Sequence, residues 1–218
     1  MKPAAKVAPN EEELKTVHDV GFKCVELYTN RNLISESHAS IANIFELEYA
    51  IHAPLDLFDK RVVDFAASVG AKVVVVHNIL DMETLAELVE YAKSHGITVC
   101  MENGGMLRKP INGKEFFAMQ SAAPSLRMCL DTEHAMQFGA PNLIEEAGHN
   151  ISHVHLTGYP PNYHSPPFEN PVVVEDIIRR LRAINYSGFI VAEMDLKYQK
   201  KEIFEKTKMF MDDVLRKT

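Results

Sequence analysis

One pattern recurs along the chain: an amphipathic stretch, a glycine, a short apolar run and then a polar residue. It occurs at Asp19–Leu27, Ser68–Asn78, Ser94–Asn103 and Tyr186–Asp195. The glycines stand where a helix would end, because glycine readily adopts the left-handed conformation found there. The apolar runs are short and rich in valine and isoleucine, which is typical of parallel strands buried on both faces. The pattern therefore predicts repeated helix–strand units.

Three further apolar runs lack the preceding glycine but otherwise show the same pattern. They are Tyr49–Ala53, Leu126–Asp131 and Ile151–Leu156. Between the runs, apolar residues recur with helical spacing. This spacing predicts helices at Arg61–Val69, Met82–Ser94, Val174–Ile184 and Ile203–Leu215. The chain thus offers seven well-defined strands, each followed by a helical segment.

An eighth strand, near Pro3–Val7, is short and weakly apolar. It precedes a clear helix at Asn10–Val20, with Asn10 as N-cap and three glutamates in the first turn. Alternating strands and helices predict an α/β fold with right-handed crossovers. Eight units favour one domain over residues 1–218, a compact (β/α)₈ TIM barrel with a short or degenerate first strand. Seven units with an open edge would instead give a doubly wound sheet.

Composition narrows the range of partners. The 218 residues are 46% hydrophobic and carry a formal charge of −7, with lysine and arginine dispersed. A chain without a basic stripe is not expected to bind nucleic acid. No apolar run approaches the ~18 residues of a membrane span, so we expect no membrane insertion and a cytoplasmic location. Cys24, Cys100 and Cys129 are scattered in apolar runs, as expected for reduced core thiols.

Polar residues end the predicted strands, although strands of such a barrel should be apolar throughout. The residues are His52, His77, Glu102, Asp131 and Glu193, joined by His155 on the seventh strand. In a parallel barrel the carboxyl ends of all strands lie on one face, where active sites are found. Side chains far apart in the sequence are therefore predicted to converge there.

Each of four central residues also has an ordinary explanation. Glu102 could begin a solvated loop, and Asp131 could cap a helix. Glu193 could pair with Lys197, and His155 could be a hydrogen-bonded core histidine. All four of these explanations would have to apply by coincidence at the same rim. We therefore interpret the four residues as one metal site.

Two glutamates, an aspartate and a histidine form an oxygen-rich ligand set. Such a set suits one divalent ion, Mn²⁺, Co²⁺, Mg²⁺ or a catalytic Zn²⁺. His153 and His155 share a strand face because side chains alternate with a period of two. We choose His155 as the ligand because it is nearer the carboxyl end of the strand, and we keep His153 as the alternative.

The motifs YAIHAPL, VVVVHN, VCMENGG, CLDTEHA, HVHLTG and IVAEMD, in this order, resemble the xylose-isomerase-like barrels. That superfamily includes sugar and sugar-phosphate isomerases and epimerases, and also endonuclease IV-type apurinic-site nucleases. The resemblance covers roughly residues 49 to 195. It is specific for the superfamily and only weakly specific for one reaction.

The resemblance implies that Glu102, Asp131, His155 and Glu193 bind the metal. Glu102 and Glu193 would also transfer a proton through an enediolate that the metal stabilises. His134 corresponds to a histidine that touches substrate in the epimerases and binds an additional zinc in the nucleases. The resemblance makes His52, His77 and His134 candidate substrate contacts. Asn103, and Tyr159 and His164 in the long segment Thr157–Pro171 that would cover the metal at this face, are further candidates. In the nucleases, histidines at the positions of His52 and His77 hold another zinc with the residue at Glu102.

Two departures limit the choice of substrate. The arginine that follows the strand-seven histidine in the ketose epimerases is Pro161 here, and their further glutamate after the strand-five ligand is absent from Met106–Arg108. The nuclease alternative lacks an Asp-x-His triplet in the proline-rich segment Thr157–Pro171. Arg108, Lys109 and Lys197 are candidates to meet an anionic group at the rim.

The sequence therefore predicts a metal-dependent isomerase or epimerase of a sugar or sugar phosphate. A zinc-dependent phosphoesterase related to the apurinic-site nucleases is the alternative, and a catalytically inactive binding barrel is a third. Because the first strand is weak, we also expect a second copy of the chain to cover the exposed edge or the bottom of the barrel in a homodimer.

Overall fold

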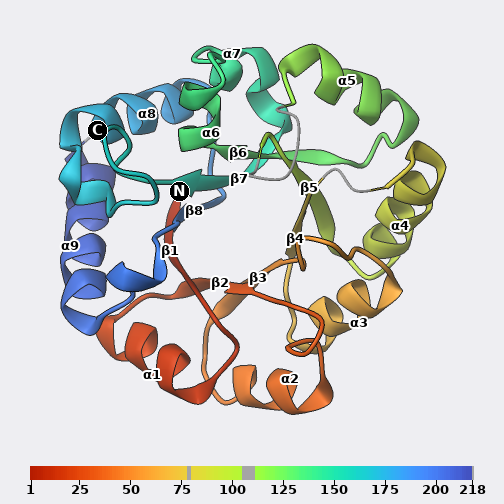
Figure 1. Cartoon of the computed structure of the whole chain (residues 1–218), viewed down its shortest axis with the longest axis horizontal. Helices are drawn as coiled ribbons and strands as arrows, with labels where there is room; N and C mark the ends of the chain where they lie inside the picture. The colour runs from red at the N-terminus through yellow and green to blue at the C-terminus, as the bar shows by residue number, and fades with distance from the viewer. Residues whose placement is uncertain (78–79, 105–110, 218) are drawn as a thin grey trace.

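The structure is a computed structural model that describes residues 1–77, 80–104 and 111–217. Eight parallel strands form a closed barrel in chain order (Figure 1). All eight are short, with four to six residues each. They are β1 Lys2–Val7, β2 Cys24–Tyr28, β3 Glu48–His52, β4 Val73–Val76, β5 Thr98–Glu102, β6 Arg127–Asp131, β7 Ile151–Leu156 and β8 Phe189–Ala192.

Helices surround this ring on the outside (Figure 1). The α-helices are α1 Glu11–Val20, α2 Glu36–Ala42, α3 Lys60–Ser68, α4 Met82–Ser94, α5 Gly113–Ala122, α6 Thr132–Gln137, α7 Leu143–Ala147, α8 Pro171–Ala183 and α9 Lys201–Lys217. Three short 3₁₀ turns are η1 Gly148–Asn150, η2 Pro167–Glu169 and η3 Leu196–Tyr198. The helix α1 begins after Asn10, whose side chain accepts the Glu13 N–H, as predicted.

The barrel is closed by β1, which pairs in parallel with both β2 and β8. The predicted (β/α)₈ barrel is thus confirmed, and the doubly wound sheet with an open edge is wrong. The strand β1 is only weakly apolar because one of its two faces carries lysine side chains. Lys2, Ala4 and Lys6 lie on the same face of the strand. The Lys6 side chain is buried between two charged partners, Glu26 on β2 and Glu193 directly after β8.

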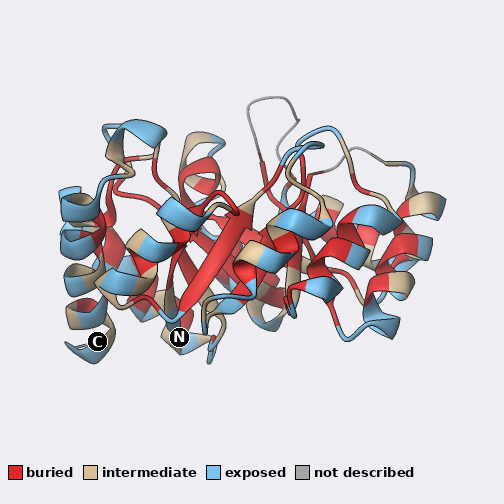
Figure 2. Cartoon of the chain, turned by 90° about the horizontal axis from the view of Figure 1, so that it is seen from below, coloured by how far each residue is buried: buried red, intermediate tan, exposed pale blue. Residues whose placement is uncertain are grey.

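The main apolar core lies between the outer faces of the strands and the helices. Figure 2 shows the buried strands in the middle and exposed helix faces outside. Inside the barrel, small side chains form two separate clusters: Ala4, Cys24 and Val191, and Val75, Cys100 and Cys129. The three cysteines are free and buried. Small residues at this level leave room for larger polar side chains nearer the carboxyl ends of the strands.

Within the described residues, no helix combines the length and the apolar character required to cross a membrane.

Candidate metal centre

The four predicted metal ligands meet at the carboxyl ends of the strands. Glu102, Asp131 and His155 are buried on β5, β6 and β7, and Glu193 directly follows β8. His155 Nδ1 lies 2.7 Å from Glu193 Oε2, 3.8 Å from Glu102 Oε2 and 4.0 Å from Asp131 Oδ2. The barrel thus brings together residues that lie far apart in the sequence.

Three atoms of this group lack a hydrogen-bond partner among the described residues, although they are buried. They are Asp131 Oδ2, His155 Nδ1 and Glu193 Oε2, and their residues form one group whose ligand atoms lie within 4.8 Å of one another. His155 Nδ1 and Glu193 Oε2 approach each other as an ion pair at 2.7 Å, but no hydrogen bond within the described part of the chain satisfies any of the three buried atoms, which calls for an explanation. One divalent cation would be bound by all three, and the donor set fits such an ion.

The electrostatics of the centre agree with this fit. Burial raises the pKa of Asp131, and the nearby charges of Glu193 and Glu102 add to the effect, so that it reaches about 7. Burial alone would also raise the pKa of Glu193, yet His155 and Lys6 hold it well below its usual range. A cation bound beside Asp131 would therefore favour the ionised form of its carboxyl group.

Asp131 has two roles. Its Oδ1 accepts the His134 N–H at 2.8 Å and caps α6, whereas Oδ2 faces the centre. The helix-cap explanation and the ligand explanation are therefore compatible. Asn103, a predicted substrate contact, holds the Asp131 backbone: its amide accepts the Asp131 N–H at 2.5 Å and donates to the Asp131 carbonyl at 3.1 Å. The structure places this side chain behind the ligand.

Three histidines surround the carboxylate of Glu102. His52 Nε2 and His77 Nε2 lie 3.3 and 3.2 Å from Oε2, and His134 Nδ1 lies 3.1 Å from Oε1. Burial would raise the pKa of Glu102, but these imidazoles hold it well below its usual range. Burial would lower the pKa of His134, yet Glu102 and Asp131 raise it to about 9. The predicted contacts His52, His77 and His134 thus lie at one side of the centre.

The segment between β7 and α8 is fixed by the buried carboxylate of Glu133. This carboxylate accepts the Thr157 hydroxyl at 3.0 Å and the His164 N–H at 2.8 Å. His164 has a left-handed backbone, with φ of 43°, and its ring is 6.3 Å from that of His134. Tyr159 stacks on Tyr163 at 5.3 Å. His164 is therefore held beside the predicted site, while the Tyr159 ring is engaged within its own segment.

Of the three basic candidates at the rim, the structure describes Lys197 alone. Lys197 pairs with Asp195 at 3.1 Å, whereas Arg108 and Lys109 lie outside the described residues. The suggested pairing of Glu193 with Lys197 is not formed. Glu193 Oε1 instead lies 2.6 Å from Lys6 Nζ.

Glu26 and Lys6 were missed by sequence reasoning. Glu26 Oε2 lies 2.6 Å from His153 Nε2 and 3.0 Å from His155 Nε2, and Lys6 Nζ lies 3.3 Å from Glu26 Oε1. The signal was available, because both are charged residues inside strand-like apolar runs. His153, the alternative ligand, groups with Glu26 one pleat deeper in the barrel, whereas His155 also faces Asp131 and Glu193.

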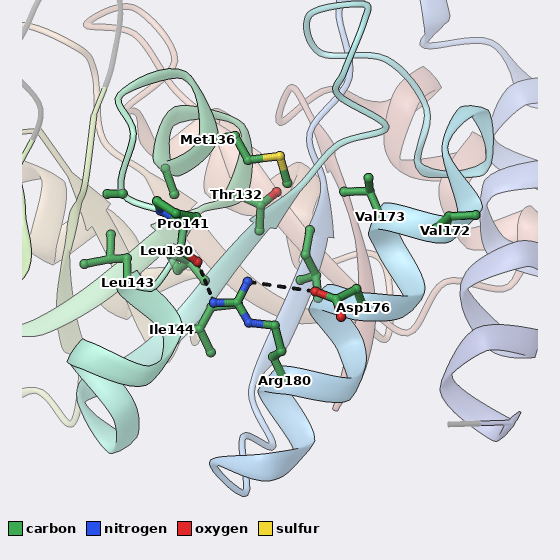
Figure 3. A pocket seen from close by; sticks show the side chains of 13 residues that line it. Leu130, Thr132, Met136, Pro141, Leu143, Ile144, Val172, Val173, Asp176 and Arg180 are labelled. Carbon is green, nitrogen blue, oxygen red and sulfur yellow. Dashed lines mark hydrogen bonds and ion pairs between the residues drawn. The ribbon is translucent and has the colours of Figure 1, made fainter.

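A pocket of 340 Å³ lies on the outer side of the barrel among β6, α6, α7 and α8 (Figure 3). Its walls are mainly aliphatic, including Leu130, Ile144 and Val173. Arg180 at its edge pairs with Glu145 and Asp176. This pocket is separate from the ligand group and contains none of the predicted site residues.

The fold belongs to a known class of barrel. The sequence model of the xylose isomerase-like TIM barrel family matches residues 58–214. The chain therefore belongs to the xylose isomerase-like TIM barrel family. No curated protein matches its sequence.

Solved structures share the fold over nearly the whole chain. The TTHB071 protein from Thermus thermophilus, soaked with ZnCl₂, has a TM-score of 0.75 at 18% identity, covering 98% of this chain and 99% of that one. A sugar phosphate isomerase/epimerase from Parabacteroides distasonis has a TM-score of 0.66 at 13% identity, with 96% and 93% covered. An AP endonuclease of family 2 from Brucella melitensis has a TM-score of 0.61 at 19% identity, with 89% and 93% covered. At these identities the likeness concerns the fold alone.

Proposed function

We propose that this chain is a divalent-metal-dependent isomerase or epimerase of a sugar or sugar phosphate. The observation that carries the proposal is the convergence of three buried ligand atoms, from Asp131, His155 and Glu193, within 4.8 Å of one another and without a hydrogen-bond partner among the described residues besides the ion-pair contact of His155 with Glu193. Glu102 completes the set from β5. A structural neighbour, from Parabacteroides distasonis, is named for such a reaction.

In this proposal Glu102, Asp131, His155 and Glu193 hold the ion. A bound divalent cation would stabilise the negative charge that develops on substrate oxygens when a proton leaves the adjacent carbon. The binding residues supply the geometry: Asp131 is fixed by its helix cap and by Asn103, and β7 fixes His155.

The proton itself would be moved by Glu102 and Glu193. The strands β5 and β8 bring these carboxylates to the rim from positions three strands apart in the ring. Both groups have a pKa below the usual range, so both are ionised at neutral pH and either can accept a proton. Two carboxylates on different sides of one carbon can remove a proton from one face and return it to the other.

The histidines beside Glu102 would orient the substrate. His134 carries a positive charge at neutral pH because its pKa is about 9, so it can donate to a hydroxyl or carbonyl oxygen. His52 and His77 offer further ring nitrogens on the same side, and His164 lies beside His134.

A second candidate function is a zinc-dependent phosphoester hydrolase. It is favoured by the approach of two imidazole nitrogens, from His52 and His77, to the same oxygen of Glu102. Imidazole and carboxylate are ordinary ligands of zinc, so a second ion could bind there. Against it, the segment Thr157–Pro171 contains no Asp-x-His triplet for a third zinc.

The first test is the metal content of purified, chelator-free protein by elemental mass spectrometry, with Glu193→Gln beside it. The control is Glu46→Gln, which removes an exposed carboxylate outside the site. About one metal per chain, retained in Glu46→Gln and lost in Glu193→Gln, supports the proposal. Two or three zincs per chain support the hydrolase instead, and no metal in any sample contradicts both.

The second test follows the proton directly. Ketoses and ketose phosphates are incubated with the protein in D₂O and followed by proton NMR. Catalysed exchange of the hydrogen next to the carbonyl supports the proposed reaction. A metal-loaded protein that exchanges no proton in any sugar, but hydrolyses phosphodiesters, would decide for the second candidate.

A further inference from the structure

Below the ligand group, the barrel interior contains buried charge that the proposed reaction does not use. Glu26 and His153 are fully buried, and Lys6 is only 8% exposed. Burying charged groups is costly unless they are paired and hydrogen-bonded. Aliphatic side chains would fill the same space without that cost, so the position of this cluster requires a physical reason.

The cluster contacts the ligands from behind. His155 presents Nδ1 to Asp131 and Glu193, while its Nε2 lies 3.0 Å from Glu26 Oε2. Glu193 presents Oε2 to the centre, while its Oε1 lies 2.6 Å from Lys6 Nζ. Lys6 and Glu26 also contact each other at 3.3 Å. Each of the two ligands thus has one atom facing the centre and the other held from the interior.

We propose that Glu26 is a positioning residue that fixes His155 with its Nε2–H toward the interior and its Nδ1 lone pair toward the metal. A neutral imidazole has one donor and one acceptor nitrogen, so an acceptor at Nε2 decides which nitrogen is free. A carboxylate behind a ligating histidine also raises the basicity of that ligand. This inference rests on the metal-dependent function proposed above.

His153 and Lys6 hold Glu26 in place for this role. His153 Nε2 lies 2.6 Å from Glu26 Oε2, within hydrogen-bond distance of the carboxylate. Lys6 approaches the other carboxylate oxygen. Contacts from both sides leave the carboxylate little freedom to turn away from His155.

The chain contains a matched control for the loss of charge. Glu48 pairs with Lys2 at 2.6 Å, just as Glu26 pairs with Lys6, and both lysines are on β1. The Lys2–Glu48 pair lies at the amino-terminal end of the barrel strands and is about half exposed. Glu48→Gln therefore removes the same charge from the same kind of pair, away from the ligands.

The test is the affinity of Glu26→Gln, Glu48→Gln and the wild type for Zn²⁺, Co²⁺ and Mg²⁺, by competition with a fluorescent chelator. Loss of an outer-shell partner typically weakens metal binding by about 10–100-fold. We expect that loss for Zn²⁺ and Co²⁺ in Glu26→Gln, with a smaller loss for Mg²⁺, which depends less on nitrogen ligands. The visible spectrum of bound Co²⁺ should change in Glu26→Gln and remain that of the wild type in Glu48→Gln.

The outcomes separate the two proposals. If the wild type binds metal and Glu26→Gln matches Glu48→Gln for all three ions, the positioning role is overturned and the metal-dependent function stands. An equal loss for all three ions shows general damage to the fold and also overturns it. A wild type that binds no divalent ion overturns both proposals.

A measurement on the wild type guards against a variant that fails to fold. In the zinc-loaded protein, long-range proton–nitrogen correlation NMR identifies the protonated ring nitrogen of His155. A protonated Nε2 and a zinc-bound Nδ1 are expected. The opposite arrangement, or an unprotonated Nε2, overturns the role of Glu26.

Discussion

Glu102 and Glu193, on the two sides of the barrel rim, have different charged neighbours. On the β3–β5 side, Glu102 is contacted by the imidazoles of His52, His77 and His134. On the β8–β2 side, Glu193 is contacted by a buried ammonium as well as by His155. Imidazoles can exchange a proton for a metal, whereas the lysine is a permanent cation. The Glu102 side can therefore bind a cation in exchange for protons on its histidines. The Glu193 side keeps the positive charge of Lys6 in any case.

Substitution of Asp131, which lies between the two sides, is expected to have the largest effect on metal affinity. Asp131→Asn removes the charge of a proposed ligand that lies between Glu102 and Glu193. Metal affinity should therefore fall by at least about 100-fold, because loss of an outer-shell partner alone can weaken binding by that factor. Calorimetric titration with Mn²⁺ measures the loss. Asp81→Asn is the control because Asp81 also caps a helix, α4, away from the site. Comparable losses in the two variants would attribute the effect to capping and contradict the assignment of Asp131.

Removal of the Lys6 ammonium directly tests the difference between the surroundings of Glu102 and Glu193. Lys6→Met should strengthen divalent metal binding about tenfold, because His153 still holds Glu26 and the loss of even a screened repulsion of ~1.4 kcal/mol corresponds to that factor. The metal-free variant should be less stable by ~3 kcal/mol, because two buried carboxylates lose their partner. Chelator competition and denaturant unfolding measure the two effects, with Lys2→Met as the exposed control. Weaker metal binding in Lys6→Met would mean that the lysine organises the site more than it repels the ion.

The imidazole side is tested by His77→Gln. With one ion per chain, the metal content should not change, and the KM for the sugar should rise about tenfold, as expected for one lost hydrogen bond to substrate. Steady-state kinetics and elemental analysis measure the two quantities. Loss of one zinc from a pair would instead show that this side holds a second ion.

The smallest expected effect is a pH dependence of proton release. Metal binding should release about one more proton at pH 6 than at pH 8, because Asp131, with a pKa of about 7, is largely protonated only at the lower pH. Calorimetry in two buffers of different ionisation enthalpy gives the count. In the metal-free protein this raised pKa favours folding fully below about pH 4, the unfolded value, and that contribution is lost as the pH rises through 7. Equal proton release at both pH values would contradict the raised pKa.

Much of the rim could be predicted because it depends on local pattern. A polar residue at the end of an apolar run marks the carboxyl end of a strand, and the parallel barrel then gathers such residues. Glu102, Asp131, His155 and Glu193 all follow this rule. The helix start at Asn10 follows equally from local capping chemistry.

The interior was not predicted because it depends on pairing between strands. Glu26 and Lys6 become neighbours only through the register that aligns β1 with β2. Each strand was expected to be apolar throughout, so the charge in β1 was interpreted as weakness of the strand. The contacts of Asn103 and His164 depend on loop conformation, which a single sequence does not encode in a periodic pattern.

The placement of the thiols has a practical consequence. Cys24, Cys100 and Cys129 are buried inside a ring of strands that has no open edge. Burial raises the pKa of Cys129 to about 12, so this thiol stays protonated and does not react as a thiolate. A thiol reagent can reach these sulfurs only after strands separate. The rate at which a thiol reagent labels them therefore reports how often the barrel opens, without any engineered cysteine.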